Sequence, residues 1–548
     1  MKIKQFLDSL TTKKIIVIFC VTGILVYILS LFNGFVWDDI PQILSNGEIQ
    51  SLKYIPGLFL HGQLGFYRPV SFSLLAVLYS LYKTSAFYYH FIQLSLHIGN
   101  TILVFLLYKK FIDKHLSFLL SLLFLVHPIN VEAVVYISAI SDPLYMFFGL
   151  ISLHLMMKER NNTFSFIVAS FFILLSLLVK EAGFLLVIMI FLYRLLFDRK
   201  NLHFVVISIA IPIAIYSYLR FIVAHTLFSR VSVIPIVSAS SVERLLTIPK
   251  IIFYYISTFV APIRLAIAQE WIVKSASLSE FFAPLMIDLV LVVVLLWLGI
   301  SIYKSQRKQL LAYIFFSLWF LIGLSMYLQV VPLDMTVAER WFYLPIIGLL
   351  GICGLLIEKF FNTAKQKNTV YAVLILIICI FSLRSIVRTI NWYDGYTLYT
   401  HDEKISNDNY LLKNNVAVEL LMRGEVDTAL KYAEDSMHLN PDWGTSWSTI
   451  GTIYFDKKDY PKAIYYLRES LNKDGGNYAG FYFLIQSLLY SKDYTSAKGW
   501  AETALKVFPN NESLIELLVI AEYKLGNIKE ATEAAQKINM TIQQVVGE

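Results

Sequence analysis

Long uncharged segments constrain this chain more than any other feature of its sequence. Residues 286–303 read MIDLVLVVVLLWLGISIY, in which Asp288 is the only charged residue. An apolar run of about 18 residues is long enough to cross a bilayer as a helix. Charged residues make up 16% of the 548 residues, whereas soluble domains contain about 25%. The sequence therefore predicts an all-α polytopic membrane protein and excludes a disordered chain, a collagen and a disulfide scaffold.

Basic clusters predict how the apolar segments cross the membrane. Lysines and arginines gather before the first apolar run and in the connections 109–114, 158–160, 198–200, 304–308 and 359–367. The positive-inside rule places such clusters in the cytoplasm. This orientation predicts eleven spans, near residues 15–33, 87–108, 115–129, 142–157, 164–180, 183–197, 202–223, 283–303, 309–328, 341–357 and 369–389. The N-terminus is then cytoplasmic and the chain after residue 390 extracytoplasmic, with 245–268 either at the outer interface or re-entrant.

The charge balance differs between the two parts of the chain. Residues 391–548 contain 15 Lys+Arg and 22 Asp+Glu, whereas the preceding residues contain 31 and 17. This difference indicates two domains in different surroundings. Topology explains the basic excess of the membrane part, so binding to nucleic acid is not implied. The three cysteines lie in separate apolar runs, so neither a disulfide nor a cysteine metal site is predicted.

The C-terminal part contains a regular repeat. Four alanines follow one another at intervals of 34 residues: Ala429, Ala463, Ala497 and Ala531. Small residues are needed where two paired helices approach closely, and a period of 34 is that of the tetratricopeptide repeat, which this array resembles. The sequence predicts four repeats over 410–545, stacked into a solenoid with a groove.

Several ionisable residues of the membrane part fall in the predicted outer connections. FVWDDIPQI contains Asp38 and Asp39, which could supply a general base and a group that orients an acceptor hydroxyl. The alternative is a solvated span end or a helix N-cap. Arg68 directly precedes Pro69, where a helix is expected to begin, and its guanidinium could hold either a substrate phosphate or lipid headgroups.

Three further connections together carry ionisable residues of both signs at the ends of spans. HPINVEAVVYISAISDP holds His127, Glu132 and Asp142; KEAG holds Lys180 and Glu181; AERWFYLP holds Glu339 and Arg340. Each has a structural alternative: a helix-end histidine, a mutual salt bridge between Lys180 and Glu181, or a headgroup anchor. No HExxH, CxxC, GxGxxG or Walker motif is present, so neither a protein-built zinc site nor a nucleotide-binding loop is predicted.

The order of these motifs resembles a known family. WDD, YRP, HPxxxEAV…SD, KEAG and AERWFYLP, followed by tetratricopeptide repeats, is similar to the transmembrane and tetratricopeptide-repeat protein O-mannosyltransferases and their bacterial relatives. The resemblance implies a C-type glycosyltransferase fold with Asp38 and Asp39 at the catalytic centre. Relatives often have a basic residue shortly before the second hairpin aspartate, whereas this chain reads YISAISD, which leaves Asp142 without that partner.

The resemblance implies transfer of a hexose, expected to be mannose, from a polyprenyl-phosphate donor to Ser/Thr hydroxyls of exported proteins. Arg68, Arg340 and Lys180 are expected to bind the donor phosphate, while His127, Glu132, Asp142, Glu181 and Glu339 support them. No metal or cofactor is expected in the protein, and a requirement for a divalent ion stays open. The rivals are a non-enzymatic membrane-anchored scaffold and a C-type enzyme acting on lipid or cell-envelope polysaccharide.

The predicted domain organisation assigns one task to each part. Residues 1–390 form the membrane glycosyltransferase-like domain, 391–409 connect it to the repeats, and 410–545 form the extracytoplasmic array. We expect the groove of the array to bind the acceptor protein, while the membrane domain, surrounded by lipid, performs the transfer.

Overall fold

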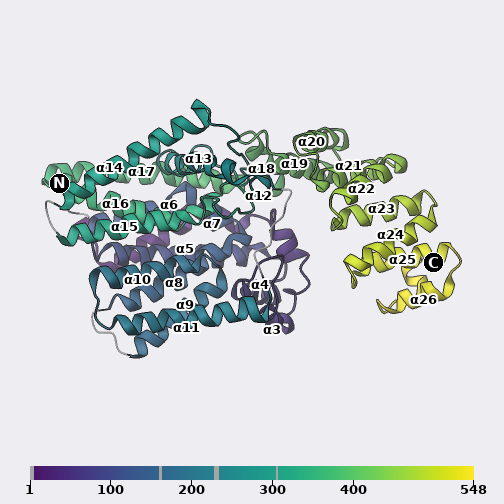
Figure 1. The fold of residues 1–548 in the computed structure, drawn as a ribbon, viewed down its shortest axis with the longest axis horizontal. Helices are drawn as coiled ribbons and strands as arrows, with labels where there is room; N and C mark the ends of the chain where they lie inside the picture. The colour runs from purple at the N-terminus through teal and green to yellow at the C-terminus, as the bar shows by residue number, and fades with distance from the viewer. Residues whose placement is uncertain (1–4, 6, 159–162, 227–233, 304–306, 548) are drawn as a thin grey trace. The chain divides into compact units, whose positions relative to one another are not determined.

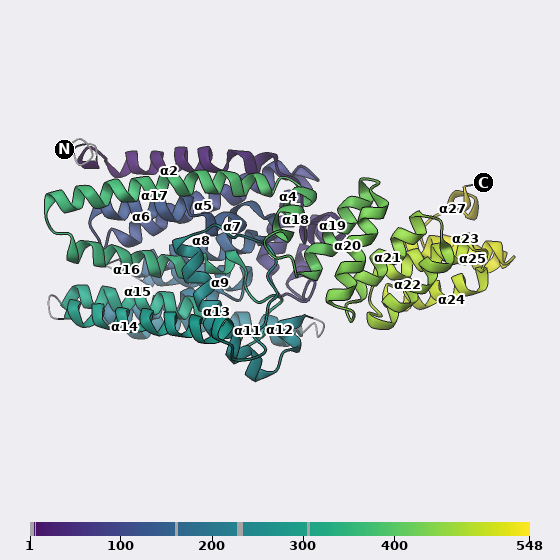
Figure 2. The same ribbon diagram turned by 90° about the horizontal axis from the view of Figure 1, so that it is seen from above.

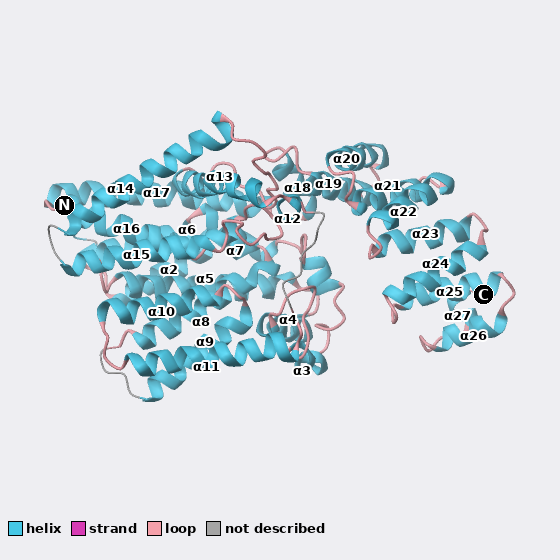
Figure 3. Cartoon of the chain, viewed as in Figure 1, coloured by secondary structure: helices cyan, strands magenta, loops and turns pink. Residues whose placement is uncertain are grey.

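The computed structural model describes residues 5, 7–158, 163–226, 234–303 and 307–547. Helices make up the regular structure of these residues, whose only β-type pairings are two isolated bridges, Gln63 with Phe66 and Gln269 with Val337 (Figure 3). The predicted all-α class is confirmed. The chain divides into two compact units, residues 1–398 and 399–548.

The first unit is a bundle of long helices that run side by side (Figures 1 and 2). They are α2 (Thr12–Tyr27), α5 (Ala86–Tyr108), α6 (Lys114–Val126), α8 (Ser141–Met156), α9 (Thr163–Val179), α10 (Gly183–Phe197), α11 (Leu202–Ser217), α13 (Ser241–Val260), α14 (Ala283–Tyr303), α15 (Arg307–Ser325), α16 (Pro345–Phe360) and α17 (Ala364–Asn391). In α6 every residue from Leu116 to Val126 is buried. In contrast, α14 exposes most of its apolar residues, as expected for a helix that faces lipid.

A helix lies over each of the eleven predicted spans, but the predicted number of spans is not confirmed. Among the described residues, six helices are long and apolar enough to cross a membrane: Thr12–Phe32, Ala86–Tyr108, Ile137–Met156, Leu202–Val223, Leu278–Tyr303 and Ala364–Asn391. A seventh candidate is the pair 114–126 and 128–135, bent by 49°. Pro128 explains the break, because proline disfavours helix at the preceding residue. Four more apolar helices are shorter.

Short helical elements fill the connections of this unit. They are η1 (Ile28–Phe32), η2 (Ile40–Leu44), η3 (Leu52–Tyr54), α3 (Ile55–Leu58), α4 (Pro69–Tyr82), η4 (Pro128–Asn130), α7 (Val131–Val135), η5 (Ile137–Ile140), η6 (Tyr218–Val223), α12 (Pro235–Ser238), η7 (Leu278–Phe282) and η8 (Glu339–Phe342). Pro69 is the first residue of α4, where its fixed φ favours helix initiation, so Arg68 does lie at the start of a helix.

The second unit is an array of paired helices. After α18 (Gly395–Glu403), the pairs are α19 (Tyr410–Met422) with α20 (Val426–Leu439), α21 (Gly444–Asp456) with α22 (Tyr460–Lys473), α23 (Tyr478–Tyr490) with α24 (Tyr494–Val507), and α25 (Glu512–Lys524) with α26 (Ile528–Gln536), followed by α27 (Ile542–Val546). Each first helix begins 34 residues after the previous one. The four repeat alanines are fully buried because the helices pack closely at these positions.

Candidate active site

Four ion pairs join connections that are far apart in the sequence, at one end of the helix bundle. They are Arg68–Glu181, Lys180–Asp142, Arg340–Glu132 and Arg388–Glu339. Seven of these eight residues belong to the predicted site, and Arg388 is added by α17. Charges buried in low dielectric need partners, so their pairing explains how the bundle retains so many ionisable groups.

Asp39 anchors the first connection to η5. Its carboxylate is fully buried: Oδ2 accepts a hydrogen bond from the N–H of Val36 at 3.0 Å. Oδ1 accepts from both the N–H and the hydroxyl of Ser138, at 2.7 and 2.6 Å. Burial raises the pKa of Asp39 to about 7, although these hydrogen bonds favour the carboxylate. Both oxygens are thus committed to holding the loop in place.

Asp38, its neighbour, is only partly buried in the first connection. Its N–H donates to the hydroxyl of Tyr136 at 3.3 Å. Burial raises the pKa of Asp38 above its ordinary value, while the Tyr136 hydroxyl and the positive charge of Arg340 lower it. The two adjacent aspartates therefore differ in their surroundings. Asp39 is buried and held by hydrogen bonds, whereas Asp38 lies near a tyrosine and an arginine.

Arg340 is fixed by Glu132, which lies in α7, beyond the bend between Val126 and Pro128. The Arg340 guanidinium donates to Oε1 of Glu132, and the Arg340 N–H donates to Oε2 at 3.1 Å. Glu132 is fully buried. The guanidinium lies 5.7 Å from the centre of the Tyr136 ring. Arg340 and Asp38 therefore flank the same tyrosine, which gives a base and a cation close together.

Lys180 and Glu181 pair with other partners, and not with each other. Lys180 Nζ donates to Asp142 Oδ1 at 2.6 Å, and this lysine supplies the positive charge that YISAISD lacks. Glu181 accepts from Nη2 and Nε of Arg68, at 2.6 and 3.3 Å. Arg68 and Lys180 hold the pKa of Glu181 at about 2, despite its burial. The side chains of Arg68 and Glu181 are 18% and 21% exposed, against 8% and 2% for Lys180 and Asp142, so Arg68 is the more accessible cation.

Two predicted supporting residues have different surroundings. Glu339 is fully buried, and Arg388 Nη2 lies 3.7 Å from its Oε1. His127 Nε2 lies 3.0 Å from the carbonyl oxygen of Phe259, and its Nδ1 accepts from the N–H of Ile129. These contacts with main-chain groups are those of a helix-end histidine, the structural alternative considered for this residue.

Sequence reasoning missed Tyr136 and Ser138, which contact the two aspartates, and Gln93, which holds their hairpin. Gln93 is fully buried and its Nε2 donates to the carbonyls of Ala133 and Tyr136, at 2.8 and 2.7 Å. A signal was present: four buried polar residues recur at helical spacing along the apolar helix α5, namely His90, Gln93, His97 and Asn100. Such a stripe at membrane depth indicates polar partners on neighbouring segments.

We predict that Gln93→Leu lowers the free energy of unfolding by about 1–3 kcal/mol, because it removes two buried hydrogen bonds to the carbonyls of Ala133 and Tyr136. Thermal unfolding of the detergent-solubilised protein measures this loss. Ser95→Ala, on the exposed face of the same helix, is the control, because its hydroxyl donates only to the helical carbonyl of Phe91. Equal stability of Gln93→Leu and Ser95→Ala would show that the hairpin does not depend on Gln93.

Among the described residues, no group of three or more His, Cys, Asp or Glu side chains is placed to hold a metal ion. The site contains ion pairs, a tyrosine and the partly buried Asp38, which are groups that transfer protons and bind anions.

No family model matches the chain, but curated proteins do. Mouse protein O-mannosyl-transferase TMTC3 is 24% identical over 493 residues, which cover 81% of this chain and 53% of that protein. Caenorhabditis elegans protein O-mannosyl-transferase F38B6.6 is 24% identical over 438 residues, covering 77% and 62%. The chain thus spans little more than half the length of these relatives. The resemblance to protein O-mannosyltransferases is confirmed.

Some solved structures are similar to about a quarter of this chain. One is the crystal structure of YrrB, described as a TPR protein with an unusual peptide-binding site, at 18% identity and a TM-score of 0.24 over 27% of this chain and 74% of that one. Another is MamA from Desulfovibrio magneticus, residues 41 to the end, at 20% identity and a TM-score of 0.23 over 25% of this chain and 75% of that one.

Proposed function

We propose that this protein transfers a hexose, mannose, from a polyprenyl-phosphate donor to Ser/Thr hydroxyls of exported proteins at the extracytoplasmic face of the membrane. Its curated relatives are protein O-mannosyl-transferases, which supports a glycosyltransferase role. The observation that carries the proposal is the arrangement of Asp38, Tyr136 and Arg340, where a partly buried aspartate and a cation flank one tyrosine.

In this reaction Asp38 is the general base and Asp39 the positioning residue. The Asp38 carboxylate takes the proton of the acceptor hydroxyl while the oxygen of that hydroxyl forms a bond to the anomeric carbon of the sugar. The bond between that carbon and the phosphate oxygen breaks, and the polyprenyl phosphate leaves with the electron pair. Asp39 is unsuited to be the base because its oxygens already accept from Val36 and Ser138.

The leaving phosphate needs positive charge, and we assign it to Arg340 and Arg68, with Lys180 in support. Each of these cations is already paired with a carboxylate, so the local charge is balanced before the donor arrives. Because the charges of the cluster are balanced, it attracts the phosphate of the bound donor only weakly. The N–H groups of the cations are nevertheless held in place, so they can stabilise the negative charge that develops on the leaving phosphate during transfer.

The lipid part of the donor suits the surroundings of the site. A polyprenyl chain stays in the bilayer while its phosphate lies at the interface, and charged groups at helix ends reach that depth. Phosphate is a competent leaving group without further activation. In this proposal residues 1–390 form the transferase domain, 391–409 connect it to the repeats, and the repeats at 410–545 bind the acceptor.

The test is direct transfer by the purified full-length protein reconstituted in liposomes. Mannose-labelled polyprenyl phosphate and a Ser/Thr peptide are supplied, and mass spectrometry measures the glycopeptide. Product on peptide hydroxyls supports the proposal, and sugar found on lipid or polysaccharide in place of peptide would contradict the acceptor class. The absence of transfer from any polyprenyl-phosphate sugar would favour a scaffold.

The rate of transfer should rise with pH through the pKa of Asp38, because only its carboxylate accepts a proton. Burial raises this pKa and the Tyr136 hydroxyl lowers it. Tyr136→Phe therefore raises the pKa further and should move the acidic limb of the pH–rate profile to higher pH. Profiles of kcat/KM for both proteins measure this shift. An unmoved limb would show that Asp38 is not the group that titrates.

A further inference from the structure

The connection between α15 and η8 is a loop closed by one of its own side chains. Gln329 is fully buried, and its Nε2 donates to the carbonyls of Met335 and Thr336, both at 2.9 Å. Its Oε1 accepts from the N–H of Leu333 at 2.9 Å. Gln329 also has a φ of +59°, a left-handed conformation that residues other than glycine keep only where their surroundings hold it. The loop is therefore held in one shape, and Asp334 lies within it.

Both ends of this loop are fixed to the rest of the unit. The N–H of Thr336 donates to the carbonyl of Gln269 at 3.1 Å, and its hydroxyl donates to the carbonyl of Trp271 at 2.8 Å. At the start of the loop, the ring of Tyr327 stacks on that of Trp341, with the ring centres 5.2 Å apart. The position of the residues between these contacts is thus defined by the fold.

Asp334 is an exposed carboxylate beside the candidate active site. It forms no hydrogen bond or ion pair with any described residue. Burial raises the pKa of Asp38, and the negative charge of Asp334 adds to that rise. Burial lowers the pKa of Arg340 and of Arg68, but their ion-pair partners raise it above its usual value, and Asp334 adds to this rise in both. Because water and salt screen an exposed charge beyond about 10 Å, Asp334 lies near all three groups.

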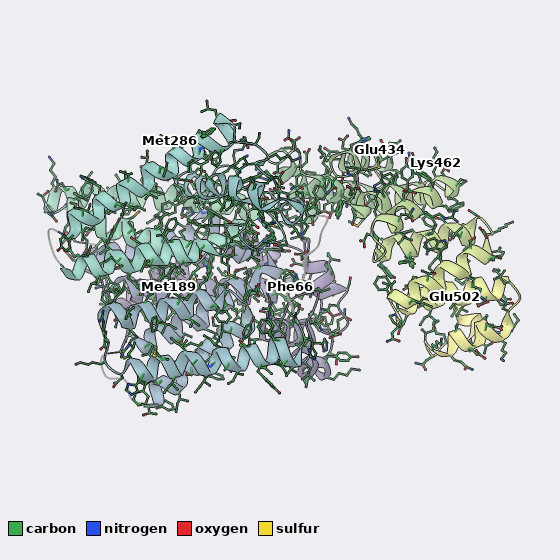
Figure 4. All side chains as sticks on the ribbon, in the orientation of Figure 1. Phe66, Met189, Met286, Glu434, Lys462 and Glu502 are labelled. Carbon is green, nitrogen blue, oxygen red and sulfur yellow. The ribbon has the colours of Figure 1, made fainter. Side chains whose placement is uncertain are left out.

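The two arginines are already engaged by other groups. Nη1 of Arg340 donates to Glu132, and Nε and Nη2 of Arg68 donate to Glu181. The Arg68 guanidinium also lies 4.3 Å from the ring centre of Phe66, which Figure 4 labels. Nη1 of Arg68 and Nη2 of Arg340 form no hydrogen bond with a described residue, so they remain for a phosphate. A further carboxylate is therefore not needed as a counter-ion.

We propose that Asp334 binds the transferred sugar by accepting hydrogen bonds from its hydroxyl groups. This inference rests on the proposed function, in which the sugar lies between the base Asp38 and the phosphate held by the arginines. Asp334 lies near both ends of that space. An ionised carboxylate accepts several hydrogen bonds, and such charge-assisted bonds are strong, which suits adjacent hydroxyls of a hexose. The same charge repels phosphate, so the sugar is the part of the donor that Asp334 binds.

Donors of equal charge are needed to detect this recognition, because loss of the Asp334 charge also changes the attraction for phosphate. The parent donor is a mannosyl phosphate of a short polyprenyl chain. Its analogues each lack one sugar hydroxyl and keep the phosphate and the lipid. Removal of the charge at residue 334 changes the affinity for parent and analogue by the same factor. A change in the ratio of their affinities therefore reports a hydrogen bond to the missing hydroxyl.

Competition with radiolabelled parent donor, in the absence of acceptor, measures these affinities for the full-length protein in detergent micelles. The unaltered protein should bind at least one deoxy analogue about 10–100-fold more weakly than the parent, the usual effect of a hydrogen bond to a charged group. In Asp334→Ala the ratio for that analogue should fall to near one. Ratios that are equal in the two proteins for every analogue would overturn the proposal.

Two further variants control for charge and for the shape of the loop. Asp408→Ala removes an exposed aspartate from the connection 391–409 and should leave every ratio unchanged; a loss there equal to that in Asp334→Ala would overturn the proposal. Gln329→Leu removes the hydrogen bonds that close the loop, so the preference for the parent donor should fall although Asp334 is retained. A stable Gln329→Leu with full preference would overturn the role given to the closed loop.

Binding and transfer are measured separately, so the sugar site and the proposed function can fail separately. A protein that prefers the parent donor through Asp334 but transfers no sugar to a peptide would keep the sugar site and lose the proposed function. A protein that transfers mannose, with a preference for the parent donor that does not depend on Asp334, would keep the function and overturn the sugar site.

Discussion

Asp38→Asn should lower the rate of sugar transfer by about 10²–10⁴-fold, the usual contribution of a general base. Asparagine has nearly the same shape as aspartate, so the contact between the Asp38 N–H and Tyr136 is retained. The amide cannot take the acceptor proton at any pH. The effect should therefore fall on kcat, and donor binding should change little. Initial rates with the reconstituted protein measure both quantities.

The controls for this prediction separate chemistry from folding. Asp113→Asn changes an aspartate that caps α6, and because asparagine caps helices equally well, full activity is expected. Asp39→Asn places an amide nitrogen in the pocket formed by Val36 and Ser138, so both stability and transfer should fall. Full activity of Asp38→Asn would show that Asp38 is not the base. If Asp113→Asn lost as much activity as Asp38→Asn, the loss would reflect a general folding defect and not the chemistry of Asp38.

Much of the fold could be predicted because its signals are local or periodic. The 34-residue spacing of Ala429 and its equivalents determines where paired helices meet, and the structure places all four alanines in full burial. The number of membrane spans could not be predicted from a comparable local signal. Apolar residues in α6 are buried by protein, and hydropathy does not distinguish burial in a bundle from contact with lipid.

The composition of the site was predictable, but its pairing was not. Charges at span ends identified Arg68, Lys180 and Glu181, yet the adjacent Lys180 and Glu181 point to different partners, Asp142 and Arg68. These partners are separated by 38 and 113 residues, so they depend on how helices pack. The difference between Asp38 and Asp39 also depends on packing, because Ser138 of another connection donates a hydrogen bond to the Asp39 carboxylate.

Arg340→Gln should cost about 3–5 kcal/mol in the free energy of unfolding, because it leaves the Glu132 carboxylate buried without its cation. Transfer should fall as well, since the proposed site loses a phosphate ligand. The double variant Glu132→Gln with Arg340→Gln removes both charges, and the amide oxygen introduced at position 132 can still accept from the N–H of residue 340. Its stability should recover most of this loss. Thermal unfolding and initial rates compare the two proteins.

The double variant separates the two roles of Arg340. If Arg340 only balances Glu132, then transfer returns together with stability. If Arg340 also holds the donor phosphate, the double variant is stable but transfers slowly, with a raised KM for the donor; this is the result we expect. Lys250 and Glu280 form a more exposed pair, with side chains 26% and 46% exposed. Their neutralisation should cost at most about 1 kcal/mol, so a large effect there would mean that removal of any ion pair from this unit impairs the protein.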